Sequence, residues 1–150
     1  MRWFTREWLE GRLPDDEWQR HMDEYAAHVQ ALRGAIPTDQ RWLLDLDLHD
    51  AQVQSWSYAD GQFAWVLLTG DLQRGYSLTS VRYLRAELTG VLPRELPGLL
   101  GHRSEVLYDE VAQTSSGLEQ RFLVHPRGEF GVVFSNASMS QEPADASLRR

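Results

Sequence analysis

The chain has 150 residues, with 15 basic and 22 acidic side chains, a formal charge of -7 and no cysteine. A chain of this length buries enough apolar surface to fold as one domain without disulfides, and the lack of cysteine excludes thiol nucleophiles and thiolate zinc sites. All 15 basic residues are arginine, which excludes lysine-based Schiff-base chemistry and a phosphate-loop lysine, and the acidic balance argues against a nucleic-acid partner.

The first 48 residues follow a helical pattern. Apolar residues recur at steps of three and four from 18 to 36, which predicts a long helix with one apolar stripe. This stripe consists of Trp18, Met22, Tyr25, Val29, Leu32 and Ile36. Pro14 suits the start of the helix, and Gly34 and Pro37 mark its end. A shorter helix is predicted over 5–12, capped by Thr5, and another turn or two over 38–45.

After residue 50 the chain shifts to short stretches rich in Val, Tyr, Phe, Trp and Thr, separated by turn residues. The pair Asp60-Gly61 is typical of a hairpin turn. The strands are predicted over 51–58, 62–69, 77–89, 104–114, 118–125 and 129–138. Tight turns between them indicate an antiparallel meander of about six strands, with the N-terminal helices packed on one face. The fold class is therefore α+β, with one domain over 1–136 and a disordered tail over 137–150.

Polar residues gather at the junction of the two halves, where Asp45, Asp47, His49 and Asp50 follow one another closely. If 45–49 is extended, alternation places Asp45, Asp47 and His49 on one face. Carboxylates with an imidazole suit a divalent metal or acid–base work, although the spacing matches no established metal motif. A solvated turn explains the same residues, with Asp50 capping its own backbone.

Two of the six tryptophans, Trp56 and Trp65, lie on strands joined by the Asp60-Gly61 turn. Across such a hairpin they face each other, and with Tyr58 and Tyr83 they form a candidate surface for a protein partner if they point away from the helices. If they point toward the helices, these aromatic residues fill the core instead.

Three segments resemble an uncharacterised bacterial domain family. They are the opening Met-Arg-Trp-Phe-Thr-Arg-Glu-Trp (1–8), Leu48-His49-Asp50 before a strand, and Leu107-Tyr108-Asp109-Glu110-Val111 before a glycine hairpin. The resemblance extends to about Phe134 and implies a bacterial origin and the helix-then-sheet order. The family has no assigned activity, so the resemblance implies no catalytic residue.

The sequence supports hypotheses of different classes. The first is a small cytoplasmic binding protein of the immunity or regulatory type, which engages a basic protein partner through its exposed sheet face and negative charge. The acidity lies mostly in residues 1–50, which hold six arginines against eleven acids. The second is a metal-dependent hydrolase or metal-binding protein built on Asp45, Asp47, His49 and Asp50. The third is a homodimer through the edge or open face of the sheet. No cofactor is implied, and no apolar run is long enough for a secretory signal or a membrane span.

Overall fold

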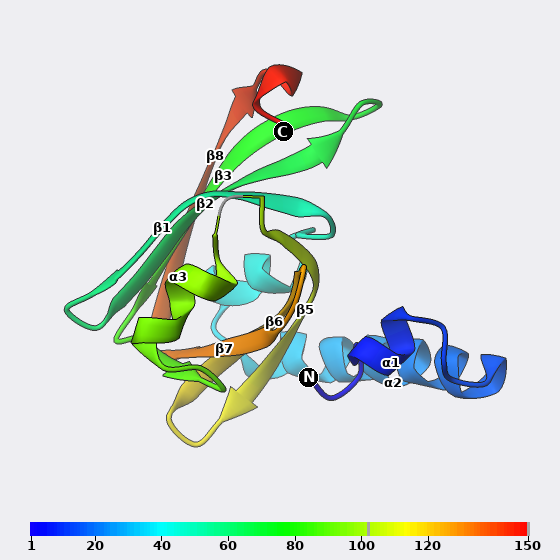
Figure 1. The fold of residues 1–150 in the computed structure, drawn as a ribbon. Coiled ribbons are helices and arrows are strands. Elements are labelled where there is room, and N and C mark those ends of the chain that lie inside the picture. Colours follow the sequence, from blue (N-terminus) through cyan, green and yellow to red (C-terminus); the bar gives the residue numbers. More distant parts are fainter. Residues whose placement is uncertain (102, 150) are drawn as a thin grey trace.

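The computed structural model describes residues 1–101 and 103–149. A short helix and a long helix come first, followed by a 3₁₀ segment and a sheet that is interrupted once by short helical turns (Figure 1). The helical elements are α1 (Arg6–Leu9), α2 (Asp15–Ala35), η1 (Thr38–Leu44), η2 (Pro93–Glu95), α3 (Leu96–Leu99) and η3 (Ala146–Leu148). The strands are β1 (Ala51–Ala59), β2 (Gln62–Asp71), β3 (Gly75–Leu84), β4 (Glu87–Thr89), β5 (Glu105–Thr114), β6 (Gly117–His125), β7 (Glu129–Phe134) and β8 (Asn136–Ala144).

The helical half follows its predicted order closely. The side chain of Thr5 accepts a hydrogen bond from the backbone N–H of Trp8 at 3.2 Å, so Thr5 caps α1 as predicted. Pro14 directly precedes α2, whose first turn carries Asp15, Asp16 and Glu17 at the positive end of the helix dipole. Among the described residues, no helix is long and apolar enough to cross a membrane.

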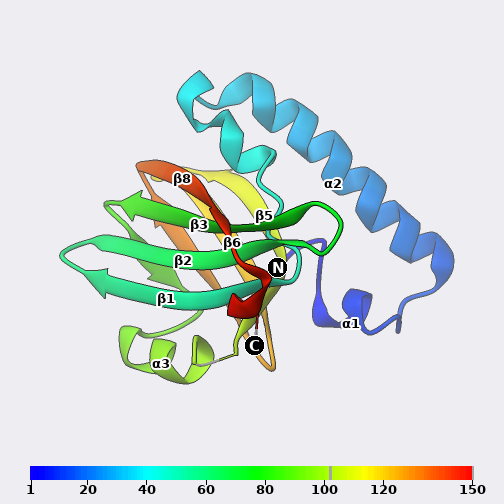
Figure 2. The ribbon, with the colours of Figure 1, turned by 90° about the horizontal axis from the view of Figure 1, so that it is seen from above.

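The α+β class is confirmed, but the sheet has eight strands instead of about six. Their order is β4-β7-β6-β5-β1-β2-β3-β8, and every pairing is antiparallel. The sheet consists of two four-stranded halves. One is the meander β1-β2-β3 with β8 beside β3, and the other is the meander β5-β6-β7 with β4 beside β7. The halves are joined by a short pairing of Ala51 with Val106 and of Gln52 with Glu105. Figure 2 shows the meander of β1, β2 and β3 with β8 beside it.

Two predicted strands each divide in two. The stretch 77–89 bends at Arg85, whose φ of 51° ends β3, and the chain continues as β4 on the far side of β7. The last stretch bends at Ser135, and the chain leaves β7 to pair with β3 as β8. Ser135 donates its backbone N–H to the carbonyl oxygen of Leu84 at 3.1 Å, which ties the two bends together. At this corner the chain crosses from one half of the sheet to the other twice, once from β3 to β4 and once from β7 to β8.

The predicted disordered tail over 137–150 differs from the structure, because residues 136–144 form β8. This strand pairs with β3 from Asn136 to Ala144. The side chain of Gln40 accepts a hydrogen bond from the N–H of Ala137 at 2.8 Å and donates one to its carbonyl at 3.2 Å. The side-chain amide of Gln40 thus satisfies both outward backbone groups of Ala137 at the edge of the sheet, as a further strand would. The polar sequence of 136–144 carries no strand signal of its own, because the strand forms by pairing with β3, which lies far away in the chain.

The hydrophobic core lies between the two halves of the bent sheet, whereas the sequence predicted a core between the sheet and the long helix. Trp65 on β2 contacts Phe122 on β6, with ring centroids 4.6 Å apart, and Tyr83 on β3 contacts Phe134 on β7 at 4.9 Å. These rings approach edge to face, which is a favoured arrangement of aromatic pairs. The sheet therefore buries most of its apolar face against itself.

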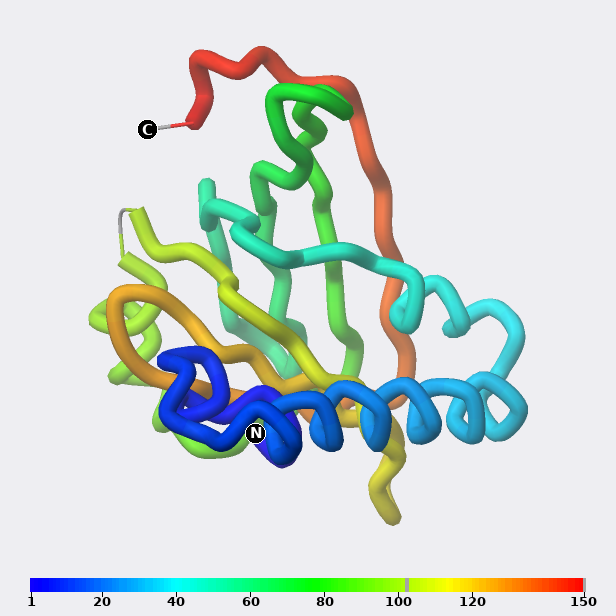
Figure 3. The backbone as a smooth tube through the Cα atoms, turned by 90° about the vertical axis from the view of Figure 1, so that its right-hand side faces the viewer, coloured from blue at the N-terminus to red at the C-terminus, as the bar shows by residue number. Residues whose placement is uncertain are grey.

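Helix α2 crosses β5 on the outer side of the sheet (Figure 3). It is attached to the part of β5 that lies beyond its short pairing with β1. Tyr25 accepts a hydrogen bond from the N–H of Val111 at 3.3 Å, and His28 bonds the carbonyl of Val111 at 2.8 Å. Leu32 and Ile36 are buried as predicted, but Trp18 and Met22 are 38% and 37% exposed. The N-terminal half of α2 extends beyond the sheet (Figure 1), so this end of the stripe has little to cover it.

Candidate functional site

The predicted aromatic surface is part of the core. Trp56 and Trp65 are directly opposite each other, as expected for the hairpin, but both turn toward the interior. Trp65 is 2% exposed and Tyr83 is fully buried. The Trp56 indole donates a hydrogen bond to the carbonyl of Leu100 at 2.9 Å, and the Tyr58 hydroxyl donates one to Ala86 at 3.2 Å. These four residues offer no exposed aromatic patch, which corrects the surface interpretation.

Of the acidic residues at the junction, Asp45 pairs with Arg33, whereas Asp47 and Asp50 both contact His49. Asp45 accepts hydrogen bonds from both terminal nitrogens of Arg33, one of them at 3.1 Å, and this pairing lowers its pKa. Asp47 accepts from the backbone N–H of His49 at 3.1 Å and lies 3.9 Å from Arg74. His49 contacts Asp50 at 3.1 Å. In the part of the chain that the structure describes, no three His, Cys, Asp or Glu side chains are placed to hold a metal ion.

One carboxyl group in the interior has an unusual pKa. Asp109 lies on the inner face of β5, where burial raises its pKa to about 7 even though Gln120 donates to it at 2.6 Å. The same Gln120 accepts a hydrogen bond from the hydroxyl of Tyr83 at 2.8 Å. The three side chains form a polar row across the apolar interior. Within the described residues Asp109 makes no other hydrogen bond.

The negative charge of the chain is concentrated in a projecting arm, residues 7–24, which spans α1 after Arg6, the following loop and the N-terminal half of α2 (Figure 1). Residues 7–24 contain seven acidic residues and two arginines, a net charge of -5. Both arginines are paired within the arm, Arg12 with Glu10 and Arg20 with Glu24. The acidic residues of this arm are Glu7, Glu10, Asp15, Asp16, Glu17, Asp23 and Glu24.

Trp18 and Met22 lie one helical turn apart on the same arm. The indole of Trp18 stacks on Trp8, with ring centroids 5.2 Å apart and nearly parallel planes. Trp8 is buried and donates its indole N–H to the carbonyl of Trp18 at 3.3 Å. The Trp18 ring is therefore held in a fixed orientation while the residue stays 38% exposed, and Met22 one turn along is 37% exposed. The arm combines an apolar centre with an acidic surround.

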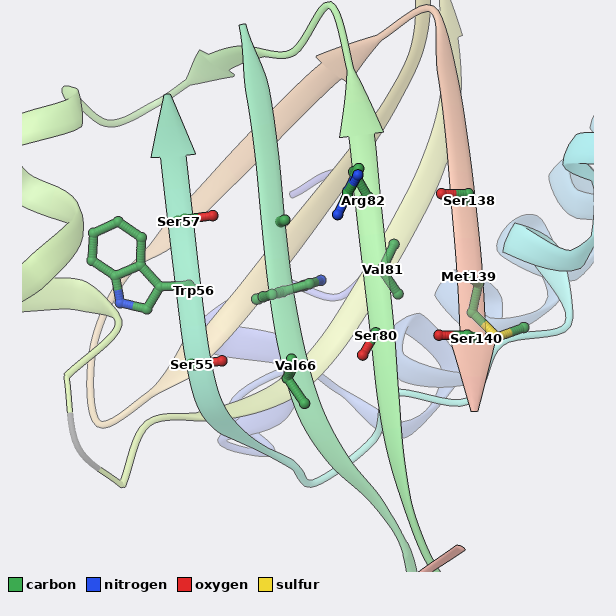
Figure 4. Close-up of a pocket in the computed structure, with 12 residues that line it drawn as sticks. Ser55, Trp56, Ser57, Val66, Ser80, Val81, Arg82, Ser138, Met139 and Ser140 are labelled. Carbon is green, nitrogen blue, oxygen red and sulfur yellow. The ribbon is translucent and has the colours of Figure 1, made fainter. Parts of the chain in front are cut away.

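A hollow of about 420 Å³ lies on the outer face of strands β1, β2, β3 and β8, the face turned away from the core (Figure 4). Most side chains on this face are small, because serine or alanine holds six of the eight positions that alternate with inward-pointing core residues. We call these residues the serine face. They are Ser55, Ser57, Ala64, Val66, Ser80, Arg82, Ser138 and Ser140.

Sequence reasoning missed both exposed features. The pairs Ser55 and Ser57 on one strand and Ser138 and Ser140 on another are spaced by two, which is the signal for side chains on one face of a strand. This spacing does not identify a strand face for Ser138 and Ser140, because the sequence predicts a disordered tail over 137–150. The exposure of Trp18 had no sequence signal, since the residue continues the apolar stripe of a helix that is buried further on.

Comparisons with protein-family models, with curated proteins and with solved structures found no match.

Proposed function

We propose that this protein is a binding protein that engages a basic protein partner through the α1–α2 arm. The observation that carries this proposal is the exposed Trp18–Met22 pair within the most acidic stretch of the chain. Tryptophan and methionine are enriched in the buried centres of protein interfaces, where charged residues are depleted, and charged residues surround such centres at the rim.

The charge of the arm favours a basic partner. A net charge of -5 within 18 residues attracts a basic protein over a distance of about one Debye length, roughly 8 Å at physiological ionic strength, and this attraction speeds association. The fixed stacking of Trp18 on Trp8 reduces the conformational entropy that the indole loses on binding. The negative charge thus speeds association and selects a basic partner, and the Trp18–Met22 pair provides the contact that excludes water.

The experiment compares the partners that purified wild-type and variant proteins retain from an extract of the native host cells. One variant removes the apolar centre (Trp18→Ala with Met22→Ala), and a second removes three acidic charges (Asp15→Asn, Asp16→Asn and Asp23→Asn). Matched controls carry the same kinds of change elsewhere on the surface: Leu72→Ala with Leu92→Ala, and Asp60→Asn, Glu87→Gln and Glu142→Gln.

We expect a basic protein that is retained by the wild type and by both controls. Both arm variants should bind it at least about tenfold more weakly, the loss expected for removing a central interface contact. High salt should weaken the wild-type complex more than the complex of the charge variant. Equal retention by arm variants and controls, or no retained protein with the wild type, would contradict the proposal.

A further inference from the structure

The serine face is a surface of unused hydrogen-bond donors. Strand register places Arg82 directly between Ala64 on β2 and Ser138 on β8, with Ser57 one strand further on. In the next row, Ser80 lies between Val66 and Ser140. Hydroxyl groups from β1, β3 and β8 therefore surround one guanidinium group (Figure 4).

Neither the guanidinium nor these hydroxyls are used within the protein. In the described part of the chain, Arg82 forms no ion pair and no hydrogen bond, and none of the five serine side chains of the face forms one. Other residues of the same types are engaged: Arg33 binds Asp45, and Ser104 donates to the carbonyl of Leu99 at 3.0 Å. The donors of the serine face are therefore available to a ligand.

The local charge is opposite to that of the whole molecule. The protein has a formal charge of -7, yet the residues that line the hollow include one arginine and no carboxylate. A guanidinium group presents its N–H groups in a planar fork that matches the oxygens of a carboxylate or a phosphate. Hydroxyl groups add single donors around such an anion. The lining thus fits an oxyanion and lacks the acidic ligands that a metal cation needs.

The floor of the hollow beside Arg82 is apolar. Ala64 and Val66 are half-buried and lie between the serines of the flanking strands. This floor can cover the carbon skeleton of a ligand whose charged group reaches Arg82. A sugar would favour an aromatic platform, but Trp56 points away from the hollow toward the loop that carries Leu100 (Figure 4).

We propose that the serine face binds a small organic oxyanion, a carboxylate or a phosphate monoester, through Arg82 and the neighbouring serine hydroxyls. The volume of about 420 Å³ lies within the range of small-molecule sites in proteins. This site is separate from the α1–α2 arm and does not depend on the proposal for a protein partner.

Titration followed by amide chemical shifts tests the proposal. The probes are benzoate, phenyl phosphate and inorganic phosphate, with benzyl alcohol as the neutral counterpart. The variants are Arg82→Gln, which removes the charge, and Arg82→Lys, which keeps the charge but loses the planar fork. Arg85→Gln is the matched control, because Arg85 is an exposed arginine three residues along the chain.

We expect saturable shifts at the amides of Ser57, Ser80 and Ser138 with benzoate or phenyl phosphate, in the wild type and in Arg85→Gln. Affinity should fall at least about tenfold in Arg82→Gln, as for loss of a charged hydrogen-bond partner, and less in Arg82→Lys. The stronger of the two organic probes identifies the anion class. Equal binding of benzyl alcohol, equal binding by Arg82→Gln, tighter binding of inorganic phosphate than of both organic probes, or no saturable shifts would each overturn the proposal.

Discussion

The hydroxyl of Tyr25 on α2 accepts a hydrogen bond from the backbone N–H of Val111 on β5, at 3.3 Å. Because β1 has already separated from β5 at this point, a helix side chain replaces the missing strand. His28, one turn further along α2, bonds the carbonyl of the same residue. One residue of β5 therefore has both of its outward backbone groups satisfied by α2, and this attachment positions the acidic arm.

Removing the Tyr25 hydroxyl should weaken this attachment. Tyr25→Phe leaves the Val111 N–H without a partner, and we expect the free energy of unfolding to fall by about 1 kcal/mol. Urea denaturation measures this loss, and hydrogen exchange at the Val111 amide should become faster. Tyr76→Phe is the control, because the Tyr76 hydroxyl makes no hydrogen bond within the described chain. An equal loss in both variants would contradict the assigned role.

Asp109 should make stability depend on pH. Its pKa is about 7 in the folded protein, against an ordinary value of 3.8. Between these values the folded state holds a proton that the unfolded state has released, so raising the pH favours unfolding. Stability should fall from about pH 4 to pH 7, by on the order of 1.4 kcal/mol for each pH unit within that window.

Replacing Asp109 by asparagine isolates this effect. The amide oxygen of Asp109→Asn still accepts the hydrogen bond from Gln120 but does not titrate. We expect the pH dependence between pH 4 and pH 7 to become flatter than in the wild type, measured by thermal unfolding across that range. Parallel pH profiles for the two proteins would show that Asp109 does not titrate near neutral pH.

Trp65 and Trp18 should differ sharply in their contribution to stability. Trp65 is almost fully buried among Phe63, Phe122 and Phe130, so Trp65→Ala should cost about 3–5 kcal/mol. Trp18→Ala should cost only about 1 kcal/mol, because Trp18 is already partly exposed to solvent. Thermal unfolding followed by circular dichroism tests both. A cost for Trp18→Ala as large as that for Trp65→Ala would place Trp18 in the core and argue against a binding role.

Alanine substitutions at Gly70 and Gly34 should change the free energy of unfolding in opposite directions. Gly70 has a φ of 95°, and an added Cβ would lie 2.2 Å from the carbonyl oxygen of Gly75 across the β2–β3 hairpin. Gly70→Ala should therefore destabilise the protein severely. Gly34 lies in α2 with open space around it, so Gly34→Ala should stabilise the protein by about 0.5–1 kcal/mol. Denaturant midpoints of the two variants decide the signs.

The sequence predicts some features of the two candidate surfaces and not others. The acidic stretch of the arm could be read directly from the sequence, since the net charge of residues 7–24 does not depend on how they fold. Exposure of Trp18 could not, because burial depends on how far the sheet extends beneath the helix. Arg82 had no sequence signal as a binding residue, since its surroundings include Ser138 and Ser140 of β8, a strand that is distant in the chain.

The sequence by itself determined the elements that depend on local chemistry. The cap at Thr5, the start of α2 after Pro14 and the β1–β2 hairpin at Asp60-Gly61 all formed as predicted, because each rests on backbone preferences and hydrogen bonds within a few residues. The direct pairing of Trp56 with Trp65 followed from that turn. The tertiary structure alone decided which face of the hairpin is buried, because period-two alternation identifies two faces without identifying the inner one. It also decided that β3–β4 and β7–β8 exchange halves of the sheet, since that exchange depends on pairing between strands about 50 residues apart.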